Sequence, residues 1–326
     1  MPKKALITGI TGQDGSYLAE HLLDQGYEVH GIIRRVANEH QDFRLSRIKN
    51  IIDKIKIHSG SLENYQSLFD IFINVKPDEL YHLAAQSFVA QSFDDEHSTL
   101  SVNTFGTHFL ISILKKVNPE CKFYFAATSE MFGKVHETPQ NENTKFNPRS
   151  IYGISKLASY EIVKNYRESY NIFACSGILF NHESPRRGSE FVTRKISLTA
   201  AKIKLGLENK IVLGNIEAKR DWGYAKDYVV AMHSMLQNDH PIDYVIGSDE
   251  THSVKDFLNY AFKCLDLNYE DYLITDKKFF RPAEVDLLIS DSSKAKKDLN
   301  WSTKTSFHEL VELMVKSDYD FCKKNK

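Results

Sequence analysis

The stretch Ala5-Leu6-Ile7-Thr8-Gly9-Ile10-Thr11-Gly12-Gln13-Asp14-Gly15 decides the fold. Its first four residues predict a short buried strand, and the periodic leucines of residues 16–25 predict a helix directly after the glycines. Backbone N–H groups approach a pyrophosphate closely only where no Cβ obstructs them, and a helix N-terminus adds a favourable partial charge. The three glycines, placed between the first strand and the first helix, therefore predict a dinucleotide-binding turn rather than an ordinary tight turn.

The chain after this turn alternates between short apolar runs and helical patterns. Strand-like runs occupy residues 28–33, 55–58, 79–83, 122–126 and 173–179, and residues 64–75 have helical periodicity. Strand and helix in alternation predict a parallel sheet, and nearly continuous apolar strands indicate that both of its faces are buried. We therefore expect an α/β fold: a Rossmann-like, doubly wound parallel sheet with a smaller, mixed C-terminal substrate-binding lobe.

The second half of the chain is less regular. Residues 194–207 and 306–322 predict helices, and short apolar runs near 211–213 and 244–246 predict strands that rejoin the sheet. We expect a dinucleotide-binding domain over residues 1–180 and a nucleotide-sugar-binding lobe over 181–326. No linker rich in Gly, Ser or Pro separates them, so the two parts should pack together.

Composition excludes several classes of function. The 326 residues carry a formal net charge of −1, which is not typical of a protein that binds nucleic acid or an anionic membrane. Four scattered cysteines predict reduced thiols in a cytoplasmic protein and no metal site. The N-terminus lacks the pattern of a signal peptide, and no apolar run is long enough to predict a transmembrane helix.

The end of the second strand indicates which cofactor binds. An acid there usually accepts hydrogen bonds from the ribose hydroxyls of NAD, whereas an arginine pairs with the 2′-phosphate of NADP. Here Arg34-Arg35 end the strand, and a guanidinium can hold a phosphate with two hydrogen bonds. The pair predicts NADP, the alternative being a solvated basic turn.

Four residues predict the chemistry. Tyr152 and Lys156 lie one turn apart on a predicted helix, where an ammonium would favour the phenolate of a neighbouring tyrosine. Such a phenolate can take a proton from a hydroxyl while hydride leaves the same carbon. Thr128, after the strand at 122–126, can hydrogen-bond that hydroxyl, and Glu130 adds a carboxylate for general acid–base catalysis that simple dehydrogenation does not need.

These residues resemble a known family. The chain is similar to the extended short-chain dehydrogenase/reductases and, among them, to the GDP-mannose 4,6-dehydratase family. The resemblance runs through Ile7–Leu18, Leu83-Ala84-Ala85-Gln86-Ser87, Thr128-Ser129-Glu130, Tyr152 with Lys156, residues 179–188 (Leu-Phe-Asn-His-Glu-Ser-Pro-Arg-Arg-Gly), Phe191-Val192-Thr193-Arg194-Lys195, Arg220-Asp221-Trp222-Gly223 and Arg281-Pro282-Ala283-Glu284-Val285.

The resemblance implies a redox-neutral dehydration of a GDP-hexose, in particular GDP-mannose to GDP-4-keto-6-deoxymannose. Tyr152, helped by Lys156 and Thr128, would deprotonate the 4-hydroxyl as hydride passes to NADP⁺. Glu130 would then remove the acidified proton at carbon 5 and protonate the departing 6-hydroxyl. Hydride would return to carbon 6, so that the cofactor is regenerated in each cycle.

The resemblance also implies binding residues. Those for the cofactor are Gly9, Gly12, Gln13, Asp14, Gly15, Arg35, Ser61, Leu62, Leu83, Ala85, Ser87, Tyr152, Lys156, His182 and Arg187. Those for the nucleotide sugar are Ser87, Glu130, Asn181, Lys195, Arg220, Arg281 and Glu284. The chain departs from the family pattern at three places: Val36-Ala37-Asn38 stand where serines are usual, Ser61 where an acid is usual, and His97 where a tyrosine is common.

Alternatives stay open at this stage. The same chemistry could act on GDP-N-acetylglucosamine or a GDP-heptose, and the fold could serve a non-catalytic NADP sensor. A 4-epimerase would share the turn and the Tyr152/Lys156 pair but has no use for Glu130. The resemblance suggests a homotetramer or homodimer.

Overall fold

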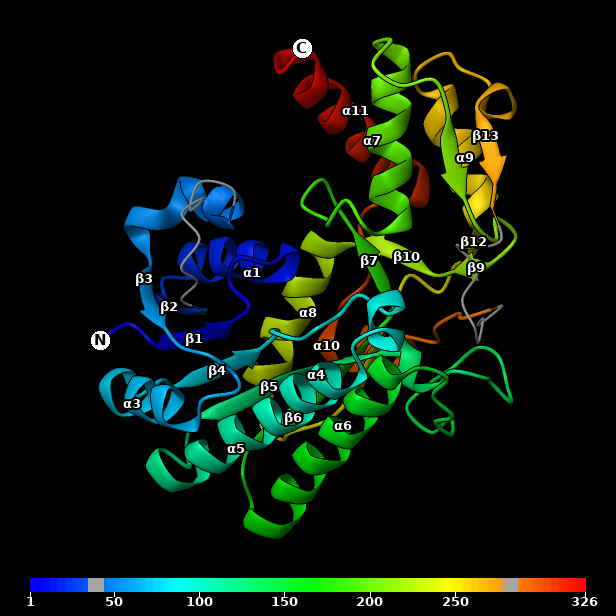
Figure 1. The fold of residues 1–326 in the computed structure, drawn as a ribbon. Coiled ribbons are helices and arrows are strands. Elements are labelled where there is room, and N and C mark those ends of the chain that lie inside the picture. The colour runs from blue at the N-terminus through cyan, green and yellow to red at the C-terminus, as the bar shows by residue number, and fades with distance from the viewer. Residues whose placement is uncertain (35–43, 277, 279–286) are drawn as a thin grey trace.

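The computed structural model describes residues 1–34, 44–276, 278 and 287–326, and at its centre lies a seven-stranded sheet (Figure 1). The strands run in the order β3-β2-β1-β4-β5-β6-β11, and every neighbouring pair is parallel. They are β1 (Lys4–Thr8), β2 (Glu28–Ile33), β3 (Lys56–Ser59), β4 (Glu79–His82), β5 (Lys122–Thr128), β6 (Ala174–Leu179) and β11 (Tyr244–Ile246). The predicted fold class is confirmed.

Helices cover both faces of this sheet. One face carries α1 (Gln13–Asp24), α8 (Ala225–Gln237) and α10 (Ser293–Leu299), and the other carries α3 (Tyr65–Val75), α4 (Glu96–Leu100), α5 (Gly106–Val117) and α6 (Ile151–Tyr170). Alternate residues of β5 enter alternate cores: Phe123 and Phe125 pack against the α3–α5–α6 side, Tyr124 against the other. Burial of both faces explains why the strands read as continuous apolar runs.

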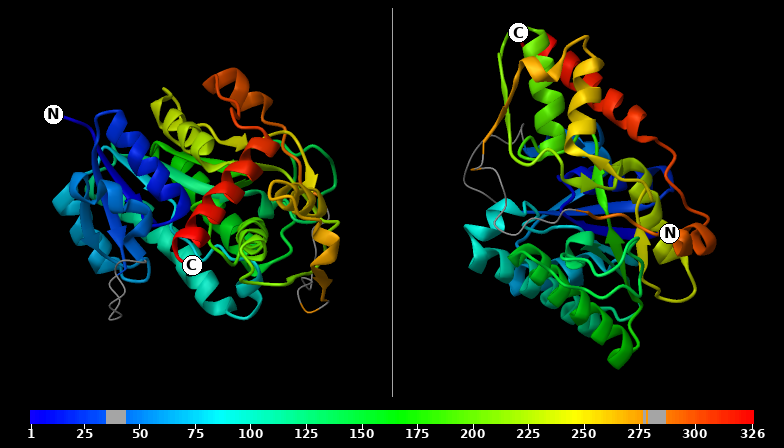
Figure 2. Two further views of the ribbon diagram at one scale, coloured as in Figure 1. Left: turned by 90° about the horizontal axis from the view of Figure 1, so that it is seen from above. Right: turned by 90° about the vertical axis from the view of Figure 1, so that its right-hand side faces the viewer.

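A second core forms at the opposite end of the molecule. Helices α7 (Val192–Lys204), α9 (Val254–Lys263) and α11 (Phe307–Lys324) pack together there, as Figures 1 and 2 show. Three small sheets accompany them: β7 (Asn181–Glu183) with β10 (Trp222–Tyr224), β9 (Lys219–Arg220) with β12 (His252–Ser253), and β8 (Ile211–Leu213) with β13 (Leu273–Thr275).

The two strands predicted to rejoin the sheet behave differently. Tyr244–Ile246 pairs in parallel with β6 and forms an edge of the central sheet. Ile211–Leu213 does not join it, so that part of the prediction was wrong. Its buried Ile211 and Leu213 pack into the core of α7, α9 and α11, and β13 supplies its hydrogen-bonding partner. The boundary at residue 180 stays a prediction.

The strand order reverses between β1 and β4, the place where ligands bind in open parallel sheets. The glycine turn follows β1 and Leu83 follows β4, so both predicted binding segments lie at this point. Within the described ranges no helix is long and apolar enough to cross a membrane.

Candidate active site

A cleft of about 1110 Å³ opens at the carboxyl ends of the parallel strands. Every predicted site residue that the structure describes lines it: Gly9, Gly12, Gln13, Asp14, Gly15, Ser61, Leu62, Leu83, Ala85, Ser87, Thr128, Glu130, Tyr152, Lys156, Asn181, His182, Arg187, Lys195 and Arg220. Arg35, Arg281 and Glu284, which were also predicted, lie outside the described residues.

The glycine turn has the geometry that a phosphate seat requires. Gly9 has a φ of +75°, and the Gly12 N–H donates to the Gly9 carbonyl oxygen at 2.9 Å. A Cβ on Gly15 would lie 2.2 Å from that same oxygen, and one on Gly9 would lie 2.9 Å from the Ala84 nitrogen. Only glycine fits at both positions, and α1 begins at Gln13, so that Gly12 is its N-cap and Gly15 lies in its first turn. The cradle therefore fits the pyrophosphate of a dinucleotide.

Thr8 joins the two strands at the switch point, and the sequence analysis did not single it out. Its hydroxyl oxygen accepts from the Leu83 and Ala84 N–H groups, both at 3.1 Å, and lies 2.8 Å from His82 Nδ1. These bonds hold the segment after β4 against the glycine turn. A threonine ending a buried strand was a usable signal, since a buried hydroxyl needs partners.

Asn103 links the segment after β4 to α6, and it too was missed. Its amide accepts from the Gln86 N–H at 2.9 Å and donates to the Gln86 carbonyl at 3.1 Å and the Ser155 hydroxyl at 2.9 Å. Asn103 is buried within a π-helical turn, Ser101–Phe105. The loop bearing Ser87 is thereby fixed relative to the helix bearing Tyr152.

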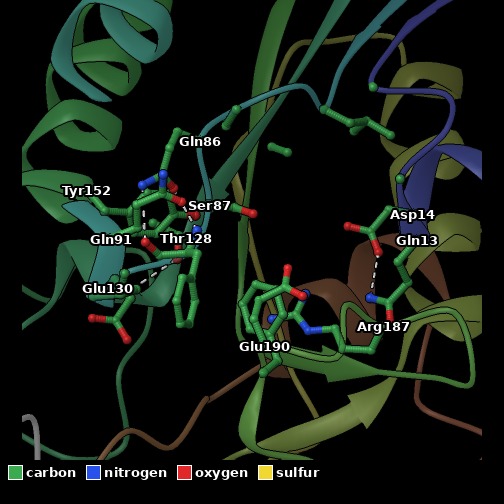
Figure 3. Close-up of a pocket in the computed structure, with 18 of the residues that line it drawn as sticks. Gln13, Asp14, Gln86, Ser87, Gln91, Thr128, Glu130, Tyr152, Arg187 and Glu190 are labelled. Atoms are coloured by element: carbon green, nitrogen blue, oxygen red, sulfur yellow. Dashed lines mark hydrogen bonds between the residues drawn. The ribbon is translucent and has the colours of Figure 1, made fainter. Parts of the chain in front are cut away.

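The four predicted catalytic residues share one wall of the cleft, where Figure 3 shows Thr128, Glu130 and Tyr152 close together. The Thr128 hydroxyl accepts from the Glu130 N–H at 3.3 Å, which starts the turn that presents Glu130. Ser150 caps α6 by accepting from the Gly153 N–H. A Cβ on Gly153 would lie 2.7 Å from the Glu130 carbonyl oxygen, so this glycine allows α6 to approach Glu130 closely.

Burial dominates the electrostatics of Tyr152 and Lys156. Burial raises the pKa of Tyr152 to about 12, and a hydrogen bond with Thr128 opposes that rise. Burial lowers the pKa of Lys156 to about 7, and its Nζ donates to the Ala126 carbonyl oxygen at 2.8 Å. Burial of both groups therefore sets their pKa values in the protein alone, and the effect of Lys156 on Tyr152 stays a prediction.

The opposite wall carries Gln13, Asp14 and Arg187 in Figure 3. His182 Nε2 lies 2.9 Å from Asp14 Oδ2, and Gln13 Nε2 donates to the His182 carbonyl oxygen at 3.0 Å. Arg187 pairs with the buried Glu183 at 3.1 Å and stacks its guanidinium 3.5 Å from the centre of the Phe191 ring. These contacts place the guanidinium of Arg187 close to Asp14, next to the glycine turn.

The predicted nucleotide-sugar residues line the part of the cleft next to the second lobe. Asn181 in β7 pairs with Trp222 of β10, two residues after Arg220. The Asn181 Oδ1 atom is buried without a hydrogen-bond partner in the described structure, which suits a ligand donor. Lys195 Nζ donates to the Val212 carbonyl oxygen at 2.7 Å, and Arg220 is 6% exposed.

Asp221, next to Arg220, anchors this wall from behind. Its carboxylate is fully buried and accepts from the Ser248 and Ser290 hydroxyls, each at 2.6 Å, and from the Ser248, Asp249 and Ser290 N–H groups. Sequence spacing gives no signal for this network, because its members lie far apart in the chain.

Comparison with known proteins points to the same family as the sequence motifs. A model of the GDP-mannose 4,6 dehydratase family matches residues 6–314. The chain is 48% identical to GDP-mannose 4,6 dehydratase 1 of Arabidopsis thaliana, over 100% of this chain and 92% of that protein. It is also 48% identical to the GDP-mannose 4,6 dehydratase of Homo sapiens, over 98% and 92%.

Solved structures share the fold. The dTDP-glucose 4,6-dehydratase of Bacillus anthracis, solved in complex with NAD, superposes with a TM-score of 0.83 at 20% identity, over 99% of this chain and 98% of that one.

Proposed function

This chain belongs to the GDP-mannose 4,6-dehydratase family, and from that premise we propose that it converts GDP-mannose to GDP-4-keto-6-deoxymannose with NADP as a recycled cofactor. The observation that carries the proposal is the meeting of Thr128, Glu130 and Tyr152 on one wall of the cleft, opposite a glycine turn that fits a pyrophosphate. Dehydration needs a carboxylate beside the tyrosine, and Glu130 supplies it.

The residues divide the proton transfers between them. Tyr152 takes the proton of the 4-hydroxyl, and Thr128 orients that hydroxyl. Glu130 takes the proton from carbon 5, which the new ketone at carbon 4 has made acidic, and delivers it to the departing 6-hydroxyl. When bound, the nicotinamide would accept the hydride from carbon 4 and return it to carbon 6, and its oxidised, cationic ring would favour the phenolate of Tyr152. Tyr152 would then return the proton of the 4-hydroxyl to carbon 5, which completes the methyl ketone and restores the tyrosine.

The choice of NADP is supported by two described arginines. Arg34 follows β2 and Arg44 donates to its carbonyl oxygen at 2.6 Å, and both line the cleft. A guanidinium pairs with a phosphate more strongly than with a ribose hydroxyl. Replacing Arg44 by Ala should weaken NADP⁺ binding about tenfold and leave NAD⁺ binding nearly unchanged. Equal losses for both cofactors would contradict the assignment.

The substrate wall is proposed from position and charge. Lys195 and Arg220 would hold the diphosphate, and Asn181 would donate to or accept from the nucleotide sugar. Arg281 and Glu284 are proposed to complete the site on the resemblance alone, as Arg35 is for the cofactor.

The test is single-turnover incubation with GDP-mannose, measuring reduced cofactor by absorbance and the product by its loss of one water in mass. Wild type should form product. Glu130→Gln should accumulate reduced cofactor without losing water, and Tyr152→Phe should do neither. Glu137→Gln, an exposed acid outside the cleft, serves as the matched control.

Normal turnover by Glu130→Gln would refute the assigned role of Glu130. A protein that dehydrates GDP-N-acetylglucosamine or a GDP-heptose in preference to GDP-mannose would change the substrate and keep the chemistry. Inertness toward every nucleotide sugar, with NADP⁺ still bound, would refute the enzyme.

A further inference from the structure

His182 sits where three elements meet. It belongs to β7, contacts Asp14 of α1, and stacks on Tyr228 of α8 with ring centres 4.6 Å apart. Its Nδ1 lies 2.7 Å from the Phe180 carbonyl oxygen and its Nε2 lies 2.9 Å from Asp14 Oδ2. The imidazole is largely buried, so the two protein acceptors are its main hydrogen-bonding partners.

Both partners of the ring are hydrogen-bond acceptors. A backbone carbonyl oxygen never donates, and an ionised carboxylate only accepts. A neutral imidazole has one N–H, so it could donate to only one of the two acceptors. At the second acceptor, the lone pair of the ring nitrogen would face the lone pair of the oxygen. An imidazolium has two N–H groups and satisfies both.

The alternative places the proton on Asp14. The second carboxylate oxygen of Asp14 accepts from Gln13 Nε2 at 3.0 Å, which favours the ionised acid. Burial by itself would raise the pKa of Asp14 and lower that of His182. The charge and hydrogen bond of the partner outweigh burial for each group, so the pKa of Asp14 is lowered and that of His182 raised.

The other charged and titratable groups around the ring leave this balance in place. Arg187 acts against the imidazolium, and it is paired with Glu183 of β7. Tyr228 offers its ring face, and Tyr152 and Lys156 of α6 are coupled to Asp14 across the cleft.

We propose that His182 is a fixed imidazolium that acts as a positioning residue, donating to Asp14 and to the Phe180 carbonyl so that the phosphate turn and β7 are locked in one register. Gln13 reinforces the link, since it donates to the His182 carbonyl and accepts from the Ser184 hydroxyl at 2.8 Å. Because β7 also pairs with β10, next to Arg220, the same link connects the cofactor seat to the nucleotide-sugar wall. This consequence rests on the proposed function; the charge of His182 does not.

The first experiment measures the charge directly in the ligand-free full chain. Long-range ¹H–¹⁵N correlation spectra of protein labelled in its histidines separate an imidazolium from each neutral tautomer, and His182→Gln assigns the signal. We expect His182 to carry both ring protons at about pH 7, above the ordinary histidine pKa. A neutral His182 at about pH 7 would overturn the proposal, whatever the enzyme's substrate.

The second experiment removes the charge and keeps the shape. In Asp14→Asn the amide can donate to Nε2, so a neutral His182 is satisfied, and we expect its spectrum to become that of a neutral ring. His182→Gln cannot reach both partners and should weaken NADP⁺ binding about tenfold by calorimetry. Asp24→Asn, exposed on the same helix, is the matched control.

A comparison of the two variants separates a positioning role of His182 from a general loss of stability. We expect Asp14→Asn to bind NADP⁺ more tightly than His182→Gln, with both variants melting cooperatively. NADP⁺ binding by His182→Gln as tight as that of wild type would overturn the positioning role. Failure of every nucleotide sugar to react, with His182 charged and NADP⁺ binding sensitive to it, would refute the proposed function alone.

Discussion

The cofactor wall and the nucleotide-sugar wall of the cleft are held in place by different kinds of contact. On the cofactor side of the cleft, short units close on neighbours in sequence: the Gly12 N–H donates to the Gly9 carbonyl oxygen, and Ser150 caps the helix that carries Tyr152. Long-range bonds, such as those of the Thr8 hydroxyl, then join these units. The nucleotide-sugar wall rests on buried carboxylates such as Asp221, whose partners lie far along the chain. Local geometry can be read from a short stretch of sequence, whereas a long-range polar network cannot.

The largest effect should come from Asp318, on α11. Its fully buried carboxylate pairs with Arg194 at 2.6 Å and accepts from the Ser197 hydroxyl at 2.6 Å. Asp318→Asn leaves the partly buried guanidinium of Arg194 without its counter-charge, so we expect a loss of about 3 kcal/mol in the free energy of unfolding.

Urea denaturation measures that loss, with the exposed Asp320→Asn on the same helix as control. Arg194 also donates to the Pro185 and Arg187 carbonyl oxygens, so NADP⁺ affinity should fall as well. An unchanged stability would remove the distinction between the two walls.

Gly15→Ala attacks the cofactor wall through its local geometry. The new Cβ would lie 2.2 Å from the Gly9 carbonyl oxygen and 2.6 Å from the Ile10 Cα, so the turn must open. We expect NADP⁺ affinity to fall about a hundredfold by calorimetry. Gly26→Ala, at a φ of +81° with no atom within 4 Å, should cost about 1 kcal/mol of stability and no affinity.

Lys156 gives the cofactor wall a signature in pH. Its pKa falls from 10.5 to about 7 on folding because it is desolvated, so the unfolded chain binds the extra proton between these values. The destabilisation by Lys156 is therefore largest below about pH 7 and fades as the pH rises.

Lys156→Met should stabilise the ligand-free protein, and its advantage should shrink by about 2–3 kcal/mol from about pH 6 to about pH 9. Chemical denaturation at the two pH values checks this. If the stability advantage of Lys156→Met grew with pH instead, the pKa of Lys156 would be raised on folding and the folded protein would stabilise the ammonium.

Asp221→Asn should have the smallest effect of the four and the most selective. The new amide group would face buried hydrogen-bond donors, so the free energy of unfolding should fall by about 2 kcal/mol. The KM for the nucleotide sugar should rise because Arg220 is adjacent, while NADP⁺ affinity stays the same. Ser248→Ala removes a single hydroxyl donor and should show a fraction of both losses. Equal loss of cofactor affinity would mean that the Asp221 network supports the cofactor side of the cleft as much as the nucleotide-sugar side.

This contrast explains how much of the molecule the sequence could predict. The glycine turn, all seven strands of the central sheet and the Tyr152/Lys156 pair follow from short patterns, because spacing along a strand or helix sets which side chains are neighbours. The placement of Ile211–Leu213 did not follow, because a short apolar strand carries no record of its partner. The rise in the pKa of Tyr152 on burial could not be predicted for a related reason: burial depends on everything packed around a residue, whereas helical spacing reports only one neighbour.

The strand that completes the edge of the sheet, β11, is translated well after its partner β6, and this has a consequence for synthesis. β6 ends at Leu179, yet the strand that completes its edge is Tyr244–Ile246. While a ribosome is still making the intervening residues, the nascent chain presents a bare row of backbone donors and acceptors along β6, which other chains can pair with. The interval between those two strands is therefore the period in which a growing polypeptide most needs a chaperone.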